Sequence, residues 1–506
     1  LDALIVSHDD EYLSYELNED EERLKYITGF SGSAGYAVIT SNDLKINEEN
    51  IEINQDNTEN GIVVDRDCAV FVDGRYVVQV KEQIDSDIFQ DFDLAKVKPA
   101  KWISSVMPKN STVGIDINCV SYEEYISIKN ELGMNNINLV ATENNLVDKI
   151  WTDKPASVIS EISIFPDEYN GCPSPQKRQL IAQTLRDKDL DATVICDPES
   201  ICWLLNIRGK DRAYLPVINC KMVAYSNEAL EWYINPNHFK DENLQDQLQE
   251  HIGHIDIFPE EAFDDVLDRL CSSSCTVYVD PETTNAHVMT KLYSGGAKVS
   301  EGLGLCQMPK ACKNHIEVAG EYKAHIKDGI AMCRFISWLD NLTALDKPTD
   351  SDETFLRRVE GVDEAELAAR ALSFRKVEAG FIEPSFATIS ALGPNAAMCH
   401  YNHENEATPR ALGKDCLYLI DSGAHFIEGT TDITRTILVG PHITDEIKRM
   451  YTLVLKSHIA LATLIFPKGT SGIQIDAIAR RPLWDCGFDF AHGTGHGVGH
   501  VLSVHE

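Results

Sequence analysis

Two aspartates near the end of the sequence are of a residue type that can bind a metal ion. Asp421 follows the apolar stretch 416–420, and Asp432 returns after a glycine-containing turn. Two adjoining strands can present both carboxylates to one point, although the sequence does not fix their register. A carboxylate at the end of a buried strand needs a positive partner, which is either Arg435 in an ion pair or a metal ion.

A histidine-rich run follows these aspartates at residues 491–506, where imidazoles alternate with glycines. Imidazole nitrogen is a common metal ligand, and glycine lets a ligand approach the backbone closely. The run is not the HExxH zinc signature, because Gly493 stands where glutamate is needed and the glycines disfavour a helix. The alternative is a flexible surface loop with solvated imidazoles.

The elements that must position these residues begin with an α/β pattern at the start of the chain. Residues 3–6 and 36–39 alternate as strands around a helix, and residues 31–35 form a small-residue loop. That loop lacks phosphate-binding spacing and precedes a strand, so it predicts a tight turn. The polar stretch 41–66 predicts a solvated insertion, after which apolar residues resume at 69–72.

A second unit repeats this plan in outline after residue 155. It has a charged helix at 175–185, a strand at 192–195 and a helix leading to residues 203–209. Its identity to the first unit is too low to establish a repeat.

The pattern of apolar and polar residues changes near residue 311. Residues 316–339 predict a long amphipathic helix, and residues 364–373 predict another helix. We expect the apolar residues of the long helix to lie near one face, namely Ile326, Ile330, Cys333 and Phe335.

Composition excludes several classes of function. A net charge of −35 over 506 residues disfavours binding to nucleic acid or to an anionic membrane. The 14 cysteines are scattered singly, as reduced thiols are in a cytoplasmic protein. We expect no signal peptide and no membrane span, because the opening residues lack a basic region followed by a long apolar one and the most apolar stretch, 452–466, is interrupted by Lys456 and His458.

Three segments of the chain resemble the pita-bread metallopeptidases and, within them, the three-domain Xaa-Pro aminopeptidases (aminopeptidase P). They are Asp421-Ser-Gly-Ala, Thr431-Asp432-Ile-Thr-Arg-Thr and His492-Gly-Thr-Gly-His496-Gly-Val-Gly. Further similar segments separate the chain from shorter relatives such as methionine aminopeptidase, and they are residues 29–35, 73–76, 145–151, 203–209 and 324–329.

The resemblance implies an α/β and α+β protein with three domains. Two creatinase-N-like α/β domains, at 1–150 and 151–310, would precede a pita-bread catalytic domain at 311–506 that lacks its C-terminal part. The implied enzyme is a metal-dependent aminopeptidase, a hydrolase acting on peptides with proline at the second position. In the family, two metals hold a bridging hydroxide that attacks the scissile carbonyl.

The same resemblance assigns metal ligands. Asp421 and Asp432 would be carboxylate ligands of two divalent ions, with Asp432 bridging, and His496 would be the nitrogen ligand. The resemblance implies manganese, the family's usual metal, and oxygen-rich ligation with one imidazole suits a hard divalent ion.

Other histidines would face the substrate. His400 and His505 match catalytic positions that bind substrate and stabilise the developing oxyanion, and His492 matches a substrate-binding position. The alternative for each is a hydrogen-bonded structural histidine. We expect no role for His403, His425 and His500.

The resemblance also implies two further glutamate ligands beyond the HGxGH run, and one of them would be the general base. The sequence ends at Glu506 before either, and Glu506 itself matches a position that is not a ligand. We therefore expect the chain as given to be an incomplete product with impaired activity.

Two other functions are compatible with this fold. A catalytically inert pita-bread module would bind peptides or proteins without turnover. Creatine-type amidinohydrolases dispense with metal, so the retained aspartates and histidine disfavour that chemistry. The family is commonly dimeric, and a homodimer is therefore an expectation.

Overall fold

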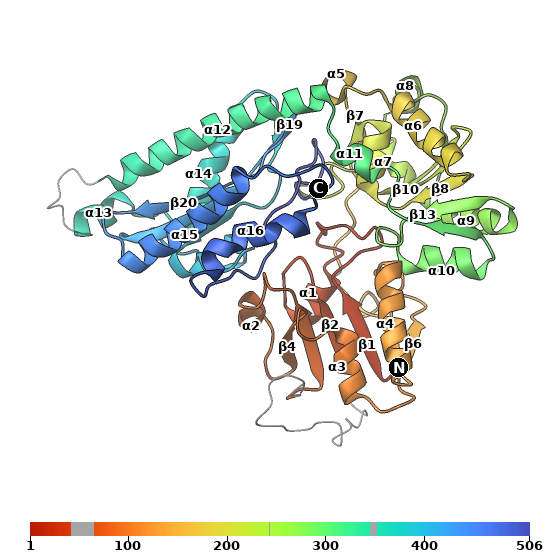
Figure 1. The fold of residues 1–506 in the computed structure, drawn as a ribbon, viewed down its shortest axis with the longest axis horizontal. Helices are drawn as coiled ribbons and strands as arrows, with labels where there is room; N and C mark the ends of the chain where they lie inside the picture. The colour runs from red at the N-terminus through yellow and green to blue at the C-terminus, as the bar shows by residue number, and fades with distance from the viewer. Residues whose placement is uncertain (42–64, 242, 345–351) are drawn as a thin grey trace. The chain divides into compact units, whose positions relative to one another are not determined.

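The computed structural model describes residues 1–41, 65–241, 243–344 and 352–506 (Figure 1). The chain divides into two compact units. The first contains residues 1–323 with the short segments 427–429 and 499–503, and the second contains 324–426, 430–498 and 504–506. Most of the insertion predicted at 41–66 lies outside the described residues.

The first unit opens with a six-stranded sheet in the order β4-β3-β2-β1-β5-β6. The β1–β2 and β2–β3 pairs are antiparallel, whereas β1–β5, β3–β4 and β5–β6 are parallel. The side chains of Val38 and Phe71 are fully buried, because helices cover the sheet. The elements are β1 (Ala3–Ser7), α1 (Arg23–Thr28), β2 (Tyr36–Thr40), β3 (Cys68–Val72), α2 (Gln79–Gln83), β4 (Phe89–Asp93), α3 (Pro99–Val106), β5 (Thr112–Ile115), α4 (Tyr122–Met134) and β6 (Asn138–Ala141).

A second sheet in the same unit has the order β12-β11-β10-β8-β13-β14. Its pairs follow the same sequence of antiparallel and parallel contacts as the first sheet. The repeated α/β plan predicted from sequence is therefore confirmed. The elements are β7 (Ser163–Ile164), α5 (Asp167–Asn170), α6 (Ser174–Asp187), β8 (Ala192–Ile195), α7 (Pro198–Leu205), β9 (Ile207–Arg208), β10 (Cys220–Tyr225), β11 (Leu230–Ile234), α8 (Leu244–Ile252), β12 (Asp256–Phe258), α9 (Phe263–Ser272), β13 (Thr276–Val279), α10 (Ala286–Ser294), β14 (Lys298–Glu301) and α11 (Gln307–Ala311).

A buried ion network joins the halves of the first unit. The Arg212 side chain is fully buried and pairs with Asp10 and with Glu21, whose Oε2 lies 2.8 Å from Nη1. Its remaining donors reach the Glu16 carbonyl and the Asn219 side chain. A buried guanidinium with this many acceptors is compensated both in charge and in hydrogen bonding.

The second unit has long helices and an antiparallel sheet in the order β16-β17-β20. Helix α12, which begins at His315 in the first unit, continues into it. In the described part of the chain, no helix is both long and apolar enough to cross a membrane. The elements are α12 (His315–Thr343), α13 (Asp352–Arg358), α14 (Glu364–Lys376), β15 (Phe381–Glu383), β16 (Ile389–Leu392), β17 (Cys416–Ser422), β18 (His425–Phe426), β19 (Gly429–Thr430), β20 (Ile433–Val439), α15 (Asp445–Ala462) and α16 (Gly472–Trp484).

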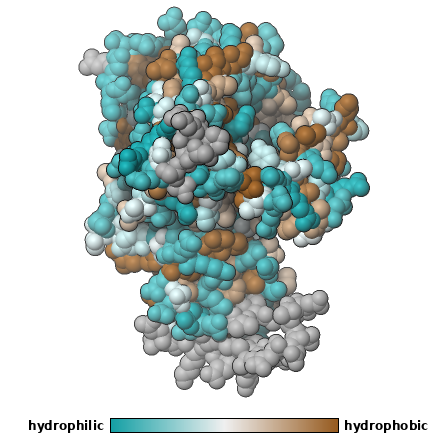
Figure 2. Space-filling model, turned by 90° about the vertical axis from the view of Figure 1, so that its left-hand side faces the viewer, coloured by the Kyte–Doolittle hydropathy of each residue, from teal (hydrophilic) through white to brown (hydrophobic). Residues whose placement is uncertain are grey.

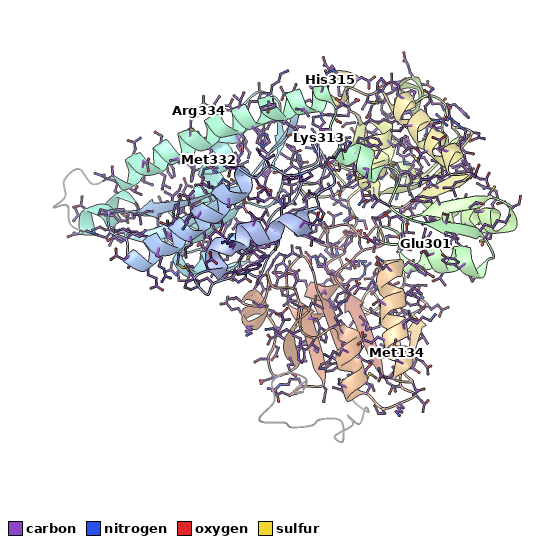
Figure 3. All side chains as sticks on the ribbon, viewed as in Figure 1. Met134, Glu301, Lys313, His315, Met332 and Arg334 are labelled. Carbon is purple, nitrogen blue, oxygen red and sulfur yellow. The ribbon has the colours of Figure 1, made fainter. Side chains whose placement is uncertain are left out.

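The long helix was predicted correctly, but its buried face was not. Phe335 is fully buried, whereas Ile326 and Ile330 are 63% and 41% exposed and Cys333 is exposed. Successive residues of a helix turn by about 100°, so Phe335 lies opposite Ile326 rather than beside it. Met332, labelled in Figure 3, is another residue of the buried side.

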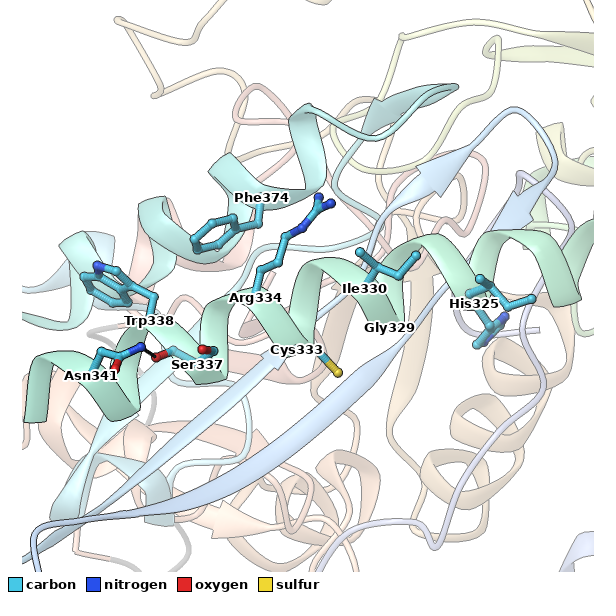
Figure 4. A pocket seen from close by; sticks show the side chains of 10 residues that line it. His325, Gly329, Ile330, Cys333, Arg334, Ser337, Trp338, Asn341 and Phe374 are labelled. Atoms are coloured by element: carbon cyan, nitrogen blue, oxygen red, sulfur yellow. Dashed lines mark hydrogen bonds between the residues drawn. The ribbon is translucent and has the colours of Figure 1, made fainter. Parts of the chain in front are cut away.

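The exposed side of α12 forms an apolar groove of about 820 Å³ with Phe374 of α14 (Figure 4). Ile330, Cys333 and Trp338 line it, and Arg334 is paired with Glu378 at its edge. Figure 2 shows hydrophobic patches among hydrophilic residues on one face of the molecule. The outward apolar residues of α12 therefore belong to the surface and not to the core.

Candidate metal centre

Strands β17 and β20 place the two predicted aspartates on one face of their sheet. Asp421 pairs with Thr434 across the antiparallel ladder, and Ser422 pairs with Ile433. Asp432 directly precedes β20, so alternation puts it on the same face as Thr434 and diagonal to Asp421. The structure thus supplies the register that the sequence left open.

Gly423 allows the two segments to approach this closely. A Cβ atom at this position would overlap the Thr431 carbonyl oxygen and the Ser385 hydroxyl group. The Ser385 hydroxyl in turn donates to the Thr431 carbonyl at 2.8 Å. The glycine between the two aspartates is therefore required by space.

One oxygen of the Asp421 carboxylate, Oδ1, is buried and lacks a hydrogen-bond partner. Burial, followed by the charge of Asp432, raises the pKa of Asp421 to about 6. Two carboxylates that disfavour each other's ionisation are stabilised by a cation between them. The donor set at this point therefore fits a divalent metal ion.

Arg435 does not supply that positive charge. It pairs with Ile420 across the ladder, so its side chain leaves the opposite face of the sheet from Asp421. The residue is exposed, and its Nη1 donates to the Thr434 carbonyl at 2.7 Å. The ion-pair alternative for Asp421 is thus contradicted.

His496 meets the aspartates from a loop that is distant in sequence. Its Nε2 lies 3.3 Å from Oδ2 of Asp432, and its Nδ1 lies 2.6 Å from the Gly497 carbonyl oxygen. The hydrogen bond to Asp432 is the main reason that the pKa of His496 is raised. With Nδ1–H held by a carbonyl, Nε2 is the atom available to a metal once it loses its proton.

The other predicted histidines are less closely associated. His505 packs edge-to-face on His496 with ring centroids 4.4 Å apart. His492 is exposed and contacts the Gly493 carbonyl and the Phe490 ring. His400 lies between β16 and β17, half-buried. The structure therefore brings His505 to the metal-site residues, whereas His492 contacts the carbonyl of its own neighbour.

Asp421, Asp432 and His496 do not by themselves enclose a metal ion. Across the described ranges, no three His, Cys, Asp or Glu side chains are arranged to hold a metal ion. Asp421, Asp432 and His496 form a chain of neighbours, with Asp432 in contact with both others. A shared central carboxylate is the arrangement expected of a bridging ligand.

A buried ion pair behind the site was missed by sequence reasoning. Arg375 donates to both carboxylate oxygens of Asp328 and, at 2.9 Å, to the Ser422 hydroxyl. Both charged side chains are essentially inaccessible, and Ser422 directly follows Asp421. An aspartate on the buried side of α12 was the signal, because a charge there requires a partner.

A short segment after His496 folds with the first unit. Arg208 donates to the carbonyls of His500 and Val501, and the His500 ring lies 3.0 Å from Glu321 and 3.1 Å from the Tyr169 carbonyl. Both ring nitrogens thus face acceptors. His500, expected to have no role, is a structural anchor of residues 499–503.

Comparison with known families covers most of the chain. Residues 319–506 match Metallopeptidase family M24, and residues 1–150 and 153–317 each match the Creatinase/Prolidase N-terminal domain. The predicted fold class, two creatinase-N-like domains followed by a pita-bread domain, is confirmed.

Individual relatives agree with these matches. The chain is 32% identical to Xaa-Pro aminopeptidase ApepP of Drosophila melanogaster and 31% identical to Aminopeptidase P1 of Arabidopsis thaliana. Both alignments include the whole chain, and they span 76% and 78% of the two relatives, respectively. The crystal structure of X-prolyl aminopeptidase from Caenorhabditis elegans, described as a cytosolic enzyme with a di-nuclear active site, is similar with a TM-score of 0.87 and 28% identity over the whole chain and 76% of that structure. The chain therefore belongs to the Xaa-Pro aminopeptidase family of M24 metallopeptidases, which are metal-dependent exopeptidases.

Proposed function

We propose that the chain hydrolyses the bond between an N-terminal residue and a following proline. Proline has no amide N–H and a restricted φ, so the enzyme must recognise the ring rather than a backbone donor. The observation that carries the proposal is the buried Oδ1 of Asp421, which has no hydrogen-bond partner and lies in the Asp421–Asp432 pair.

Asp421, Asp432 and His496 would hold two divalent ions as part of a larger ligand set, with Asp432 between them. Mn²⁺ is the proposed metal, because carboxylates with one imidazole suit a hard cation. When bound, the ions would polarise the scissile carbonyl and activate water. Loading requires Asp421 to ionise and His496 to release the Nε2 proton, so uptake of metal should release protons.

The histidines would act on the substrate side. His505 packs against His496, which supports a role in steadying the oxyanion beside the metal site. His400 would share that role from the loop after β16, and His492, being exposed, would contact the peptide. These roles stay predictions until each is substituted.

The test is peptide cleavage by the purified protein loaded with Mn²⁺. We expect release of the first residue from a peptide with proline second, no release from a matched peptide with alanine second, and loss of activity on chelation. Metal and peptide binding without turnover would favour the inert module instead.

Further properties remain proposals. We propose a cytoplasmic protein, because its singly scattered cysteines are typical of reduced thiols. We also propose that it binds neither nucleic acid nor anionic membranes, because its net charge is −35. We propose a homodimer, to be measured by light scattering. We also propose domain boundaries near residues 150 and 310, and limited proteolysis should cut there first if these segments are linkers.

A further inference from the structure

Glu364, the first residue of α14, carries an unusually well-bonded buried carboxylate. Its side chain is fully inaccessible. Oε1 accepts hydrogen bonds from the Leu392 amide at 2.7 Å and from the Asn395 side chain at 3.0 Å. Oε2 accepts from the Tyr401 hydroxyl at 2.7 Å and from the Arg410 amide at 2.9 Å. The carboxylate is thus surrounded by donors on both oxygens.

No cation accounts for this burial. Among the ion pairs formed by described residues, none includes Glu364, and Arg410 contributes its backbone amide while its side chain is exposed. Asp363 caps the same helix through the Glu366 amide at 2.9 Å. The negative charge is therefore held by neutral donors at the positive end of a helix.

The Leu392 amide belongs to the last residue of β16, and the other three donors come from the stretch of chain that joins β16 to β17. The backbone of Glu364 reaches the same stretch, because its amide donates to the Arg410 carbonyl at 3.1 Å and its carbonyl accepts from Ser390 at 2.7 Å. Glu364 therefore fixes both ends of this connection as well as its middle.

The middle of the connection carries His400. Tyr401, the next residue, is buried with its hydroxyl on Glu364, and Asn395 donates to that same hydroxyl at 3.0 Å. Burial and the Glu364 contact raise the pKa of Tyr401, so the phenol stays a donor. The neighbouring residues 393–400 are half-buried or exposed, and two of them, Ala396 and Met398, pack against the small core cluster that contains Tyr401. The hydrogen bonds of Glu364 therefore add to this packing.

We propose that Glu364 is a positioning residue, which holds residues 392–401 so that His400 can meet the substrate. The proposal rests on the proposed function for its catalytic part. Its structural part, that Glu364 fixes this connection, stands on the contacts alone.

The matched test uses Glu364→Gln with Glu366→Gln as control. Glutamine keeps the shape but turns an NH₂ group toward N–H donors, whereas Glu366 is about 41% exposed and pairs with Arg370 on the surface of the same helix. We expect Glu364→Gln to lower kcat/KM by about 10-fold to 100-fold, as the loss of a residue that orients a functional side chain does. Glu366→Gln should leave kcat/KM unchanged.

A double-mutant cycle separates positioning from general damage. In a His400→Ala background, Glu364→Gln should change kcat/KM by less than about 3-fold, because the two substitutions then remove the same contribution. Additive effects of Glu364→Gln and His400→Ala would overturn the proposal. If Glu364→Gln does not fold, Tyr401→Phe takes its place in the same cycle, because this substitution removes one of the donors to Glu364.

Hydrogen exchange distinguishes failure of this inference from failure of the proposed function. Glu364→Gln, or Tyr401→Phe, should accelerate exchange in residues 392–401 more than in β17. Unchanged exchange there would overturn the structural part whether or not the protein cleaves peptides. If neither the parent nor any variant cleaves peptides while exchange in residues 392–401 is faster in the variants, the proposed function is rejected. The catalytic part of the inference then falls with it, but the structural part stands.

Discussion

The Nε2 atom of His496 lies 3.3 Å from Oδ2 of Asp432, although a turn, a strand and two helices separate the two residues along the chain. Asp432 also touches Asp421, so it is the residue common to both contacts of the site. This central place makes Asp432 the most informative position to change.

We predict that Asp432→Asn weakens Mn²⁺ binding by more than about 10-fold, because a bridging charge is lost while the shape is kept. Titration calorimetry measures the effect directly. Asp445→Asn is the control, since Asp445 is fully exposed at the start of α15. Equal metal affinity in the parent and in Asp432→Asn would contradict the assignment of Asp432 as a ligand.

Gly423→Ala should disturb the site through space alone. The added methyl group would overlap the Thr431 carbonyl, and forcing apart such contacts costs about 1–3 kcal/mol. We expect a lower melting temperature and weaker Mn²⁺ binding. Gly413→Ala, where nothing lies near the added atom, should change neither property.

Asp328→Asn should destabilise the second unit, because it leaves the buried Arg375 charge without its partner. Removing one member of a buried pair costs about 3–5 kcal/mol, whereas a surface pair such as Glu366–Arg370 is worth about 0–1 kcal/mol. Thermal unfolding should therefore separate Asp328→Asn from Glu366→Gln. Replacing Asp328 and Arg375 together by Leu and Met should recover much of the loss, and a failure to recover would show that the charges themselves are needed.

We predict that the stability of the first unit depends on pH through the buried carboxyl group of Asp9. Burial, followed by the charges of Glu124 and Asp10, raises the pKa of Asp9 from 3.8 to about 7. Between these values the unfolded chain loses the proton first, so this residue's contribution to stability falls as pH rises. Asp9→Asn removes the penalty and should stabilise the protein by at most about 4 kcal/mol at pH 8, and by little at pH 4.

The comparison must be made between the variant and the parent at each pH. Burial lowers the pKa of His8 to about 4, which gives the opposite dependence, because a base with a lowered pKa favours folding as pH rises. Asp153→Asn, on an exposed residue, serves as control. A melting-temperature difference between Asp9→Asn and parent that does not grow with pH would reject the prediction.

Local patterns were enough to predict much of the fold. The strand that contains Asp421, the helix of residues 175–185 and the strand of residues 192–195 were predicted because period and composition agree there. The repeated plan was visible in the order of elements, but not the pairing directions, which depend on contacts distant in sequence.

Other features could not be predicted, for identifiable reasons. The buried side of α12 was misjudged because apolar residues occur around the whole helix, and only tertiary contacts select Phe335 over Ile326. Arg435 was an alternative partner of Asp421 until the register placed it on the other face. Glu364 gave no signal, since a glutamate in the first turn of a helix is ordinary on a surface.

The two sheets of the first unit have the same strand order and pairing directions in sequences too different to align by eye. Both segments match the Creatinase/Prolidase N-terminal domain, so the chain carries two versions of one six-stranded α/β domain in series. The strand order depends on the handedness and length of the connections between strands, and not on which apolar side chains fill the core. The first unit thus shows that the core residues of this α/β domain can change widely while the strand order and pairing directions stay the same.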